Sequence, residues 1–435
     1  MRDLTTDSLE SLEALFRSVE ARSRLILALE AMVAVVFLSR VIDGGVRVER
    51  IEAVLLGVAA LVVLFRGFFP LVFMKRKRLD ELRPDVHFGV HTRDSLVALS
   101  RRVFERSGLA PDAAPVFLIR EKELNAQASR AEFLPGLRFR NEVYLNRSIV
   151  HLLNEPELES VVGHELGHVF PYAPMLSRFY LLHAFFSVTA TLWLADVLAP
   201  WGIFWVAPFL TVWGLSYLIS YPWRRMKVGV ELLCDAHGAR VAGLLAAMST
   251  EVKMQAENEV RGELLALTLE ARLKQRGEVP LQRLVETYQE ALPFGRSDPE
   301  ATRLELERQF EKQRKESAGP SLGGFLAFIG FGGGLDEGVV DDDAVEQSLR
   351  SLRALQKIPV VEIDRERYLS GSDRWTMESA RELVARIEEQ RDRLLFRVED
   401  ELPGGESTHP NASRRVLFLW RNRDRLRGSA ISARS

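Results

Sequence analysis

The apolar residues of this chain gather in four blocks, and these blocks constrain its fold more than any other feature. The fourth block, Trp201–Trp223, has no charged side chain and, at about 1.5 Å per residue, is long enough to cross a bilayer core. The other blocks, each with one or two ionisable side chains, are Leu25–Ile42, Ala53–Met74 and Phe179–Leu198. The sequence therefore predicts four transmembrane helices in two hairpins. The alternative for each block is a buried helix of a water-soluble domain.

Lysine and arginine residues predict how these hairpins are oriented. Basic residues follow the second block at 75–78 and the fourth block at 224–227, whereas the short loop after the third block has none. Positive residues collect on the cytoplasmic side of membrane proteins. We therefore expect both termini and the segments 75–178 and 224–435 in the cytoplasm, with the lipid bilayer as a partner.

The blocks also divide the chain into parts. An amphipathic helix is expected in residues 1–24, where Leu9, Leu12 and Phe16 share one face. The remaining parts are a first membrane hairpin at 25–74, a cytoplasmic part at 75–178, a second hairpin at 179–223 and a helical cytoplasmic part at 224–435.

Composition excludes two classes of function. The 435 residues carry a net charge of −2, which gives no reason to expect nucleic acid as a partner. The single cysteine, Cys234, excludes an intrachain disulfide and a metal site built from several cysteines.

Local patterns predict a mainly helical chain with a small mixed sheet. We expect a strand at Val116–Ile119 and a hairpin within 137–145 that turns at Asn141-Glu142. The expected helices cover 155–170, 226–245, 250–276, 280–292, 299–317, 343–355, 376–398 and 410–426. The glycine-rich segment Gly323–Gly334 is expected to be a loop over the core, or a loop that touches the membrane or the active site.

The chemistry of the chain is carried by residues 164–168, His-Glu-Leu-Gly-His, on the expected 155–170 helix. Spacing i, i+4 puts the imidazoles of His164 and His168 on one helix face, where they can bind one metal ion. Zinc favours nitrogen ligands and, in catalytic sites, leaves a position open for water. Glu165 can reach such a water as a general base. The alternative is a helix with two ordinary surface histidines.

A site of this kind needs a third ligand, and Glu231 is the candidate. Glu231 and Asp235 are i, i+4 neighbours on the helix that follows the fourth block. Glu231 could bind zinc, and Asp235 could accept a hydrogen bond from a ligand imidazole and fix its orientation. The alternative is a solvated acidic face.

With these motifs the sequence resembles the HtpX-like membrane zinc metallopeptidases, which are related to the CAAX prenyl endopeptidases. Two apolar blocks precede HExxH, and a second hairpin separates it from the ExxxD pattern. An Asn-Ala pair, Asn125-Ala126, lies upstream of a short strand, and Thr408-His409-Pro410 with Arg415 lies near the end. The resemblance covers about residues 50–240 and the region around 405–420.

The resemblance implies a role for each matching residue. It makes His164, His168 and Glu231 the ligands of one Zn2+ per chain, and Glu165 the catalytic base. It further places Asn125 and Ala126 on an edge strand that binds the peptide substrate, His409 as a donor to the oxyanion, and Arg415 as a brace for the site. The chain departs from the family in having Val230 and Cys234 beside the two acids.

Together these features predict a membrane-embedded zinc metalloendopeptidase with a zincin-like α+β cytoplasmic domain. It would cleave membrane or membrane-proximal proteins at a cytoplasmic site in the bacterial inner membrane, in protein quality control, as a monomer or an oligomer. One alternative is a non-catalytic membrane scaffold that retains the fold. Another is an intramembrane protease of the site-two type, disfavoured because Glu155, Glu157 and Glu159 make the HExxH helix polar.

Overall fold

The structure, a computed structural model, describes part of the chain. It covers residues 8–43, 76–119, 125–134, 137–172, 176–198, 206–275, 342–369, 371–398 and 410–428. The predictions that fall outside the described residues are the block Ala53–Met74, the helices at 280–292 and 299–317, the segment Gly323–Gly334, and His409.

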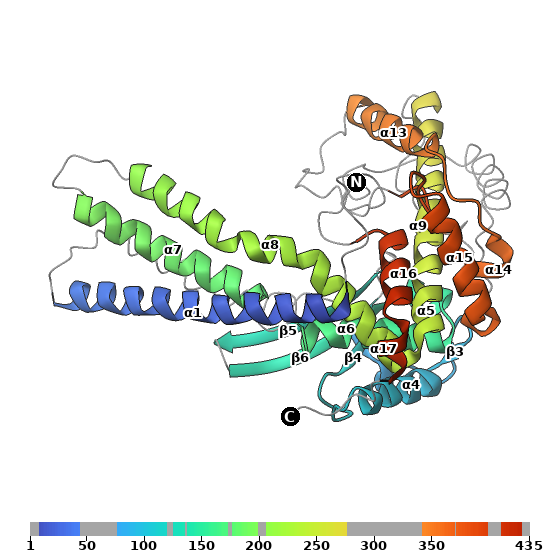
Figure 1. Cartoon of the computed structure of the whole chain (residues 1–435), viewed down its shortest axis with the longest axis horizontal. Helices are drawn as coiled ribbons and strands as arrows, with labels where there is room; N and C mark the ends of the chain where they lie inside the picture. Colours follow the sequence, from blue (N-terminus) through green and yellow to red (C-terminus); the bar gives the residue numbers. More distant parts are fainter. Residues whose placement is uncertain are drawn as a thin grey trace.

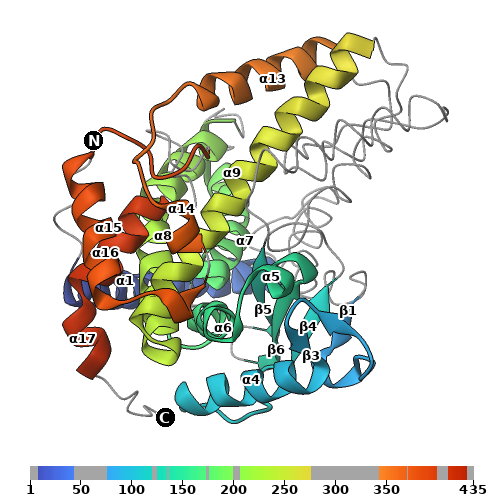
Figure 2. The same ribbon diagram turned by 90° about the vertical axis from the view of Figure 1, so that its right-hand side faces the viewer.

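Helices dominate the described residues (Figures 1 and 2). The α-helices are α1 (Leu9–Ile42), α4 (Arg93–Arg106), α5 (Arg147–Leu152), α6 (Glu155–Val169), α7 (Leu176–Leu198), α8 (Val206–Ala242), α9 (Leu244–Gln275), α13 (Asp342–Gln356), α14 (Arg365–Leu369), α15 (Met377–Glu389), α16 (Ala412–Arg421) and α17 (Arg423–Gly428). The 3-10 helices are η1 (Leu79–Glu81) and η3 (Ser372–Arg374). The strands are β1 (Arg76–Arg78), β2 (His87–Phe88), β3 (His91–Thr92), β4 (Val116–Ile119), β5 (Ala126–Leu134) and β6 (Leu137–Asn146).

Three long helices, α1, α7 and α8, lie side by side and project from the rest of the molecule (Figure 1). A polar cluster around the buried His183 joins them: its ring contacts Glu30 Oε1 through Nδ1 at 2.5 Å and Ser216 Oγ through Nε2 at 2.7 Å. Many apolar side chains of the three helices are exposed, among them Leu25, Val35 and Trp213. The projection therefore has polar contacts among its buried apolar residues, such as Leu27 and Phe37, and carries further apolar side chains outside.

The predicted fold class is wrong in its four transmembrane helices. Within the described residues, none of the helices combines sufficient length with sufficient apolar character to cross a membrane. Polar and ionisable residues interrupt the apolar blocks: Glu30 and Arg40 lie in α1, His183 and Asp196 in α7. In α8 the apolar stretch contains serines, aromatic residues and Pro222, which lower its mean hydropathy.

One helix replaces two elements that the sequence had separated. The fourth apolar block and the expected helix at 226–245 are continuous in α8, which runs from Val206 to Ala242 with Pro222 in its interior. The chain then turns at Gly243, whose φ of +99° favours glycine, and enters α9. The segment that carries Glu231 is thus a direct extension of the projecting helix.

A mixed four-stranded sheet packs beside the HExxH helix α6, as the sequence predicts. The strand order is β1-β4-β6-β5, with β4 and β6 parallel and the other pairs antiparallel. The hairpin expected within 137–145 is wrong, because these residues form the single strand β6, whose hairpin partner is β5. A Pro-Gly pair at 135–136 lies between β5 and β6 and is the turn signal in the sequence.

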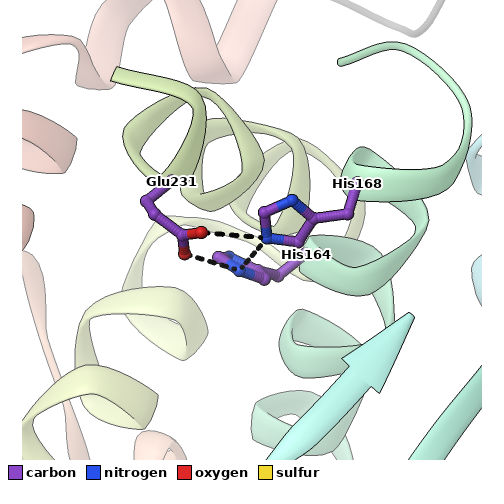
Figure 3. A group of neighbouring side chains, drawn as sticks. All are labelled: His164, His168 and Glu231. Atoms are coloured by element: carbon purple, nitrogen blue, oxygen red, sulfur yellow. Dashed lines mark hydrogen bonds and ion pairs between the residues drawn. The ribbon is translucent and has the colours of Figure 1, made fainter. Parts of the chain in front are cut away.

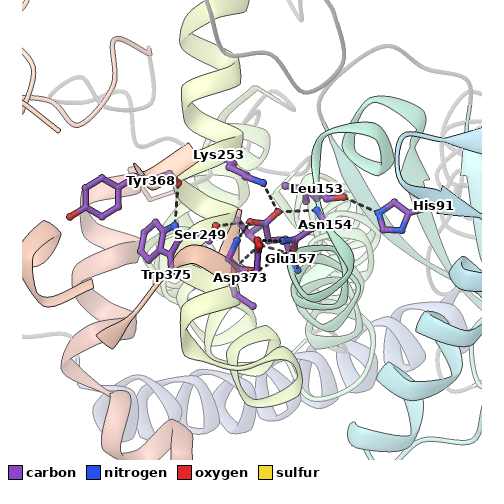
Figure 4. Close-up of polar contacts among 12 residues, drawn as sticks. His91, Leu153, Asn154, Glu157, Ser249, Lys253, Tyr368, Asp373 and Trp375 are labelled. Atoms are coloured by element: carbon purple, nitrogen blue, oxygen red, sulfur yellow. Dashed lines mark hydrogen bonds and ion pairs between the residues drawn. The ribbon is translucent and has the colours of Figure 1, made fainter. Parts of the chain in front are cut away.

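Helix α6 is buried along most of its length, between the sheet, α8 and α9 (Figure 2). Its start is fixed by a capping box, in which the Asn154 side chain accepts from the Glu157 backbone and the Glu157 side chain accepts from the Asn154 backbone. The Glu157 carboxylate also accepts from Ser249 Oγ, from Lys253 Nζ at 2.9 Å, and from the Ser372 backbone (Figure 4). A fully hydrogen-bonded, buried carboxylate therefore ties α9 and the 372–375 segment to the first turn of α6.

Small residues allow α6 and α8 to pack closely. A Cβ added to Gly163 would lie 3.0 Å from the Gly238 Cα, and one added to Gly167 would lie 3.0 Å from the Cys234 Sγ. A Cβ on Gly238 would lie 2.6 Å from the Ser160 carbonyl oxygen, closer than real Cβ atoms approach. The separation of the two helices is therefore set by glycine and cysteine at their contact.

This contact predicts the effect of adding one methyl group. Gly238→Ala should lower the free energy of unfolding by about 1–3 kcal/mol, because the backbones of α6 and α8 must move apart. Gly262→Ala on α9 is the matched control, since a Cβ there meets nothing within 4 Å. Alanine is the better helix former, so the control should stabilise the protein by up to about 1 kcal/mol. Chemical denaturation of both variants checks this, and equal stability of the two would contradict the close contact.

Candidate metal centre

Three side chains from two helices converge where α6 and α8 meet (Figure 3). His164 and His168 project from adjacent turns of α6, and Glu231 reaches them from α8. The two Nε2 atoms are 3.1 Å apart. The Glu231 carboxylate lies 3.5 Å from His164 Nε2 through one oxygen and 3.4 Å from His168 Nε2 through the other.

The spacing of these atoms fits one zinc ion. Zinc binds imidazole nitrogen at about 2.0–2.1 Å with tetrahedral angles, so two of its ligand atoms lie about 3.3 Å apart. The three separations here, 3.1, 3.4 and 3.5 Å, are all close to that value. The donor set, two imidazoles and one carboxylate, is also the set that catalytic zinc sites use with an open position.

The orientation of His164 is fixed by Asp235, one turn after Glu231. The Nδ1–H group of His164 donates to Asp235 Oδ1 at 2.8 Å, which leaves Nε2 free to face Glu231 and His168. Arg415 of α16 in turn donates to both oxygens of Asp235, with 2.7 Å from Nε to Oδ2. Burial alone would raise the pKa of Asp235, but Arg415 and His164 hold it below its ordinary value.

The electrostatics of the site favour a positive charge between His164 and the acids. Burial disfavours the imidazolium, yet hydrogen bonds to Asp235 and Glu231 outweigh it and raise the pKa of His164 well above its usual value. In the metal-free site, His164 is therefore a positively charged imidazolium at neutral pH, with both ring nitrogens protonated. A divalent cation would take the place of the proton on Nε2.

Glu165 and Cys234 lie in the same contact between the helices. Glu165 is buried on α6, directly after His164 in the chain, and its charge acts on the Cys234 thiol of α8. Burial and the neighbouring acids Glu231 and Asp235 raise the pKa of the Cys234 thiol well above its usual value. Cys234 is therefore a small packing residue against Gly167, as the sequence predicts, and not a nucleophile.

The structure describes three of the four remaining predicted site residues. Asn125 precedes β5 and its carbonyl accepts from the Asn146 backbone at 3.2 Å, while Ala126 is the first residue of β5. Arg415 is buried and contacts Asp235, which in turn contacts His164. His409 lies outside the described residues, immediately before the buried Pro410.

One carboxylate beside the site was not predicted from the sequence. Glu251 of α9 is buried and its Oε2 lies 2.5 Å from Arg415 Nη1. The only signal for it in the sequence is an acid on a largely apolar helix face, a pattern too common to single it out.

The protonated state of His164 predicts that zinc binding releases a proton. At pH 7, binding should release about one proton per zinc, because His164 must lose its proton before Nε2 can act as a ligand. Affinity should accordingly fall as the pH falls. Isothermal titration calorimetry in buffers of different ionisation enthalpy measures the released protons. An affinity that is unchanged between pH 8 and pH 6 would contradict the assigned proton.

Comparisons with known proteins agree with this geometry. The family model described as peptidase family M48 matches residues 90–421, a range that contains the three candidate ligands, Asp235 and Arg415. No curated protein and no solved structure matches the chain. Because the family model covers more than half of the 435 residues, the chain belongs to peptidase family M48, the family of zinc metallopeptidases that the HExxH motif suggests.

Proposed function

We propose that this protein is a zinc-dependent endopeptidase whose metal is held by His164, His168 and Glu231. The observation that carries the proposal is the spacing of their ligand atoms, which all lie within 4.8 Å of one another and match the separations around a single zinc. Membership of peptidase family M48 supports the reaction class.

The chemistry follows from the positions of the side chains. When bound, the zinc supplies a Lewis acid that polarises the scissile carbonyl and lowers the pKa of water. The Glu165 carboxylate accepts the proton of the attacking water and passes it to the nitrogen of the leaving amine. The Nδ1–H···Oδ1 contact with Asp235 holds His164 in one orientation throughout. His409 is proposed, from the resemblance, to donate to the oxyanion.

The substrate is proposed to bind as an added strand on β5. In the described residues β5 is the last strand of the sheet, and α6 packs against it. Since the Asn125 carbonyl accepts from the Asn146 backbone, strand alternation turns the N–H and C=O groups of Ala126 and Ala128 outward. An extended peptide could pair with these groups and lie along α6.

This mode of binding defines the class of substrate. Only an extended stretch of polypeptide can pair with a strand edge, so folded segments are excluded until they open. Locally unfolded proteins are therefore the proposed substrates, which agrees with a role in protein quality control.

The catalytic roles predict two different mutant phenotypes. Glu165→Gln should retain stoichiometric zinc and lower the rate of casein cleavage by about 100- to 10,000-fold, the usual contribution of a general base. His164→Ala should lose both zinc and cleavage. The measurements are zinc content by atomic emission and cleavage by gel electrophoresis, on full-length protein purified under chelation and then given zinc.

The same assay tests the alternative of a non-catalytic scaffold. Wild-type protein that binds zinc but cleaves no unfolded protein, even at high enzyme concentration, would favour the scaffold. Cleavage that persists in Glu165→Gln at the wild-type rate would remove Glu165 from its role or indicate a contaminating protease.

The substrate model predicts the effect of removing one outward N–H group. Ala128→Pro should lower kcat/KM for an unfolded substrate by about 3- to 10-fold, the loss of one hydrogen bond, because proline has no donor. The pairing of β5 with β6 should survive, since the Ala128 N–H does not face β6. Ala128→Val keeps the donor and is the control. Equal kcat/KM for wild type, Ala128→Val and Ala128→Pro would contradict binding at this edge.

A further inference from the structure

The Arg415 guanidinium lies buried between carboxylates from two different helices. Its Nε and Nη2 groups donate to Asp235 of α8, and its Nη1 lies 2.5 Å from Glu251 Oε2 of α9. All three residues are buried, with exposed fractions of 9% for Arg415, 4% for Asp235 and 6% for Glu251. The pair of contacts therefore joins α8, α9 and α16 behind the metal centre.

The geometry of the guanidinium explains why the second carboxylate matters. Arginine presents its donors in a rigid planar fork, so the direction of one edge fixes the direction of the others. The Nε–Nη2 edge can face both oxygens of Asp235 only if Nη1 points toward α9, where it forms an ion pair with Glu251 whose geometry is not that of a hydrogen bond. Without the Glu251 carboxylate, the cationic fork would lose this buried ion pair on the α9 side, and it would be free to turn away from Asp235.

We propose that Glu251 is a positioning residue of the metal centre, which acts through Arg415 and Asp235 to hold His164 Nε2 in place for the metal. The contacts form an unbroken series, from Glu251 to Arg415, from Arg415 to Asp235 at 2.7 Å, and from Asp235 to His164 at 2.8 Å. Glu251 does not contact a ligand in this series. The inference rests on the proposed metal centre and extends it by one residue.

The burial of the Glu251 carboxylate, which is unfavourable for its charged form, agrees with a positioning role. Burial raises the pKa of Glu251 to about 7, and the nearby Arg415 reduces that rise. A buried carboxylate of this kind contributes little to stability, and an apolar residue of similar size is often as stable or more so. Groups that orient metal ligands in this way typically contribute 10- to 100-fold to metal affinity.

The experiment compares two buried acids of the same helix. Glu257 of α9 is 4% exposed and pairs with Arg261 of its own helix at 3.4 Å, so it is a matched control. Full-length Glu251→Leu should bind zinc about 10- to 100-fold more weakly than wild type, measured against a competing chelator. Glu251→Gln, which keeps the size of the side chain and a polar oxygen next to Nη1, should recover part of the loss. Glu257→Leu should bind zinc as wild type does.

Two further measurements separate positioning from general destabilisation. Cobalt substituted for zinc reports ligand geometry through its visible absorption, which should change in Glu251→Leu and not in Glu257→Leu. Thermal unfolding of the metal-free variants measures stability independently. In an Arg415→Met background, Glu251→Leu should have no additional effect on zinc affinity, because the path from Glu251 runs through Arg415.

The possible results distinguish a failure of the role of Glu251 from a failure of the proposed metal centre. Zinc affinity and cobalt spectra of Glu251→Leu that equal those of wild type overturn the role of Glu251 alone. Effects of Glu251→Leu and Arg415→Met that simply add would show that Glu251 acts by another route. Wild-type protein that binds zinc and cleaves nothing would contradict the proposed function while the role of Glu251 stands, and wild-type protein that binds no zinc would remove both.

Discussion

The close contact between α6 and α8 is the constraint on which the candidate metal centre depends. Two ligands come from α6 and the third from α8, so the helix separation decides whether Glu231 reaches His164 and His168 at 3.4–3.5 Å. Glycine is unfavourable within a helix by about 1 kcal/mol relative to alanine. Glycines at the contact of α6 with α8 are nonetheless needed, because a larger side chain would push the third ligand away from the other two.

Charge is distributed around this contact so that few buried carboxylates lack a cation. Arg415 lies between Asp235 and Glu251, and Lys253 neutralises Glu157 at the start of α6. Glu231 is the acid that the metal itself would neutralise, together with the imidazoles. The start of α6 is thereby joined to α9 through Glu157, and its C-terminal half is joined to α8 through the contacts of His164 with Asp235 and Glu231.

The residues of the site could be predicted from the sequence where their spacing lies within a single helix. Spacing within α6 and within α8 predicts the ligands and Asp235, because i, i+4 neighbours share a face whatever the tertiary structure. The hairpin was misplaced, since alternation along β6 resembles two short strands and the Pro-Gly turn signal at 135–136 lies before it. Glu251 was missed because its partner, Arg415, is remote in the sequence. The transmembrane prediction gave the length of the apolar blocks more weight than the ionisable side chains within them, such as His183, which pairs with Glu30 inside the helix bundle.

The continuity of α8 connects the projecting helices with the metal centre. With 37 residues and about 1.5 Å of rise per residue, α8 is about 55 Å long. Its first half packs against α1 and α7, and its second half carries Glu231 and Asp235. The site further requires α6, α9 and α16, so its residues come together only when most of the described fold is in place. Metal binding and folding of this chain are therefore linked, and a zinc ion that binds the folded state alone stabilises all of these helices at once.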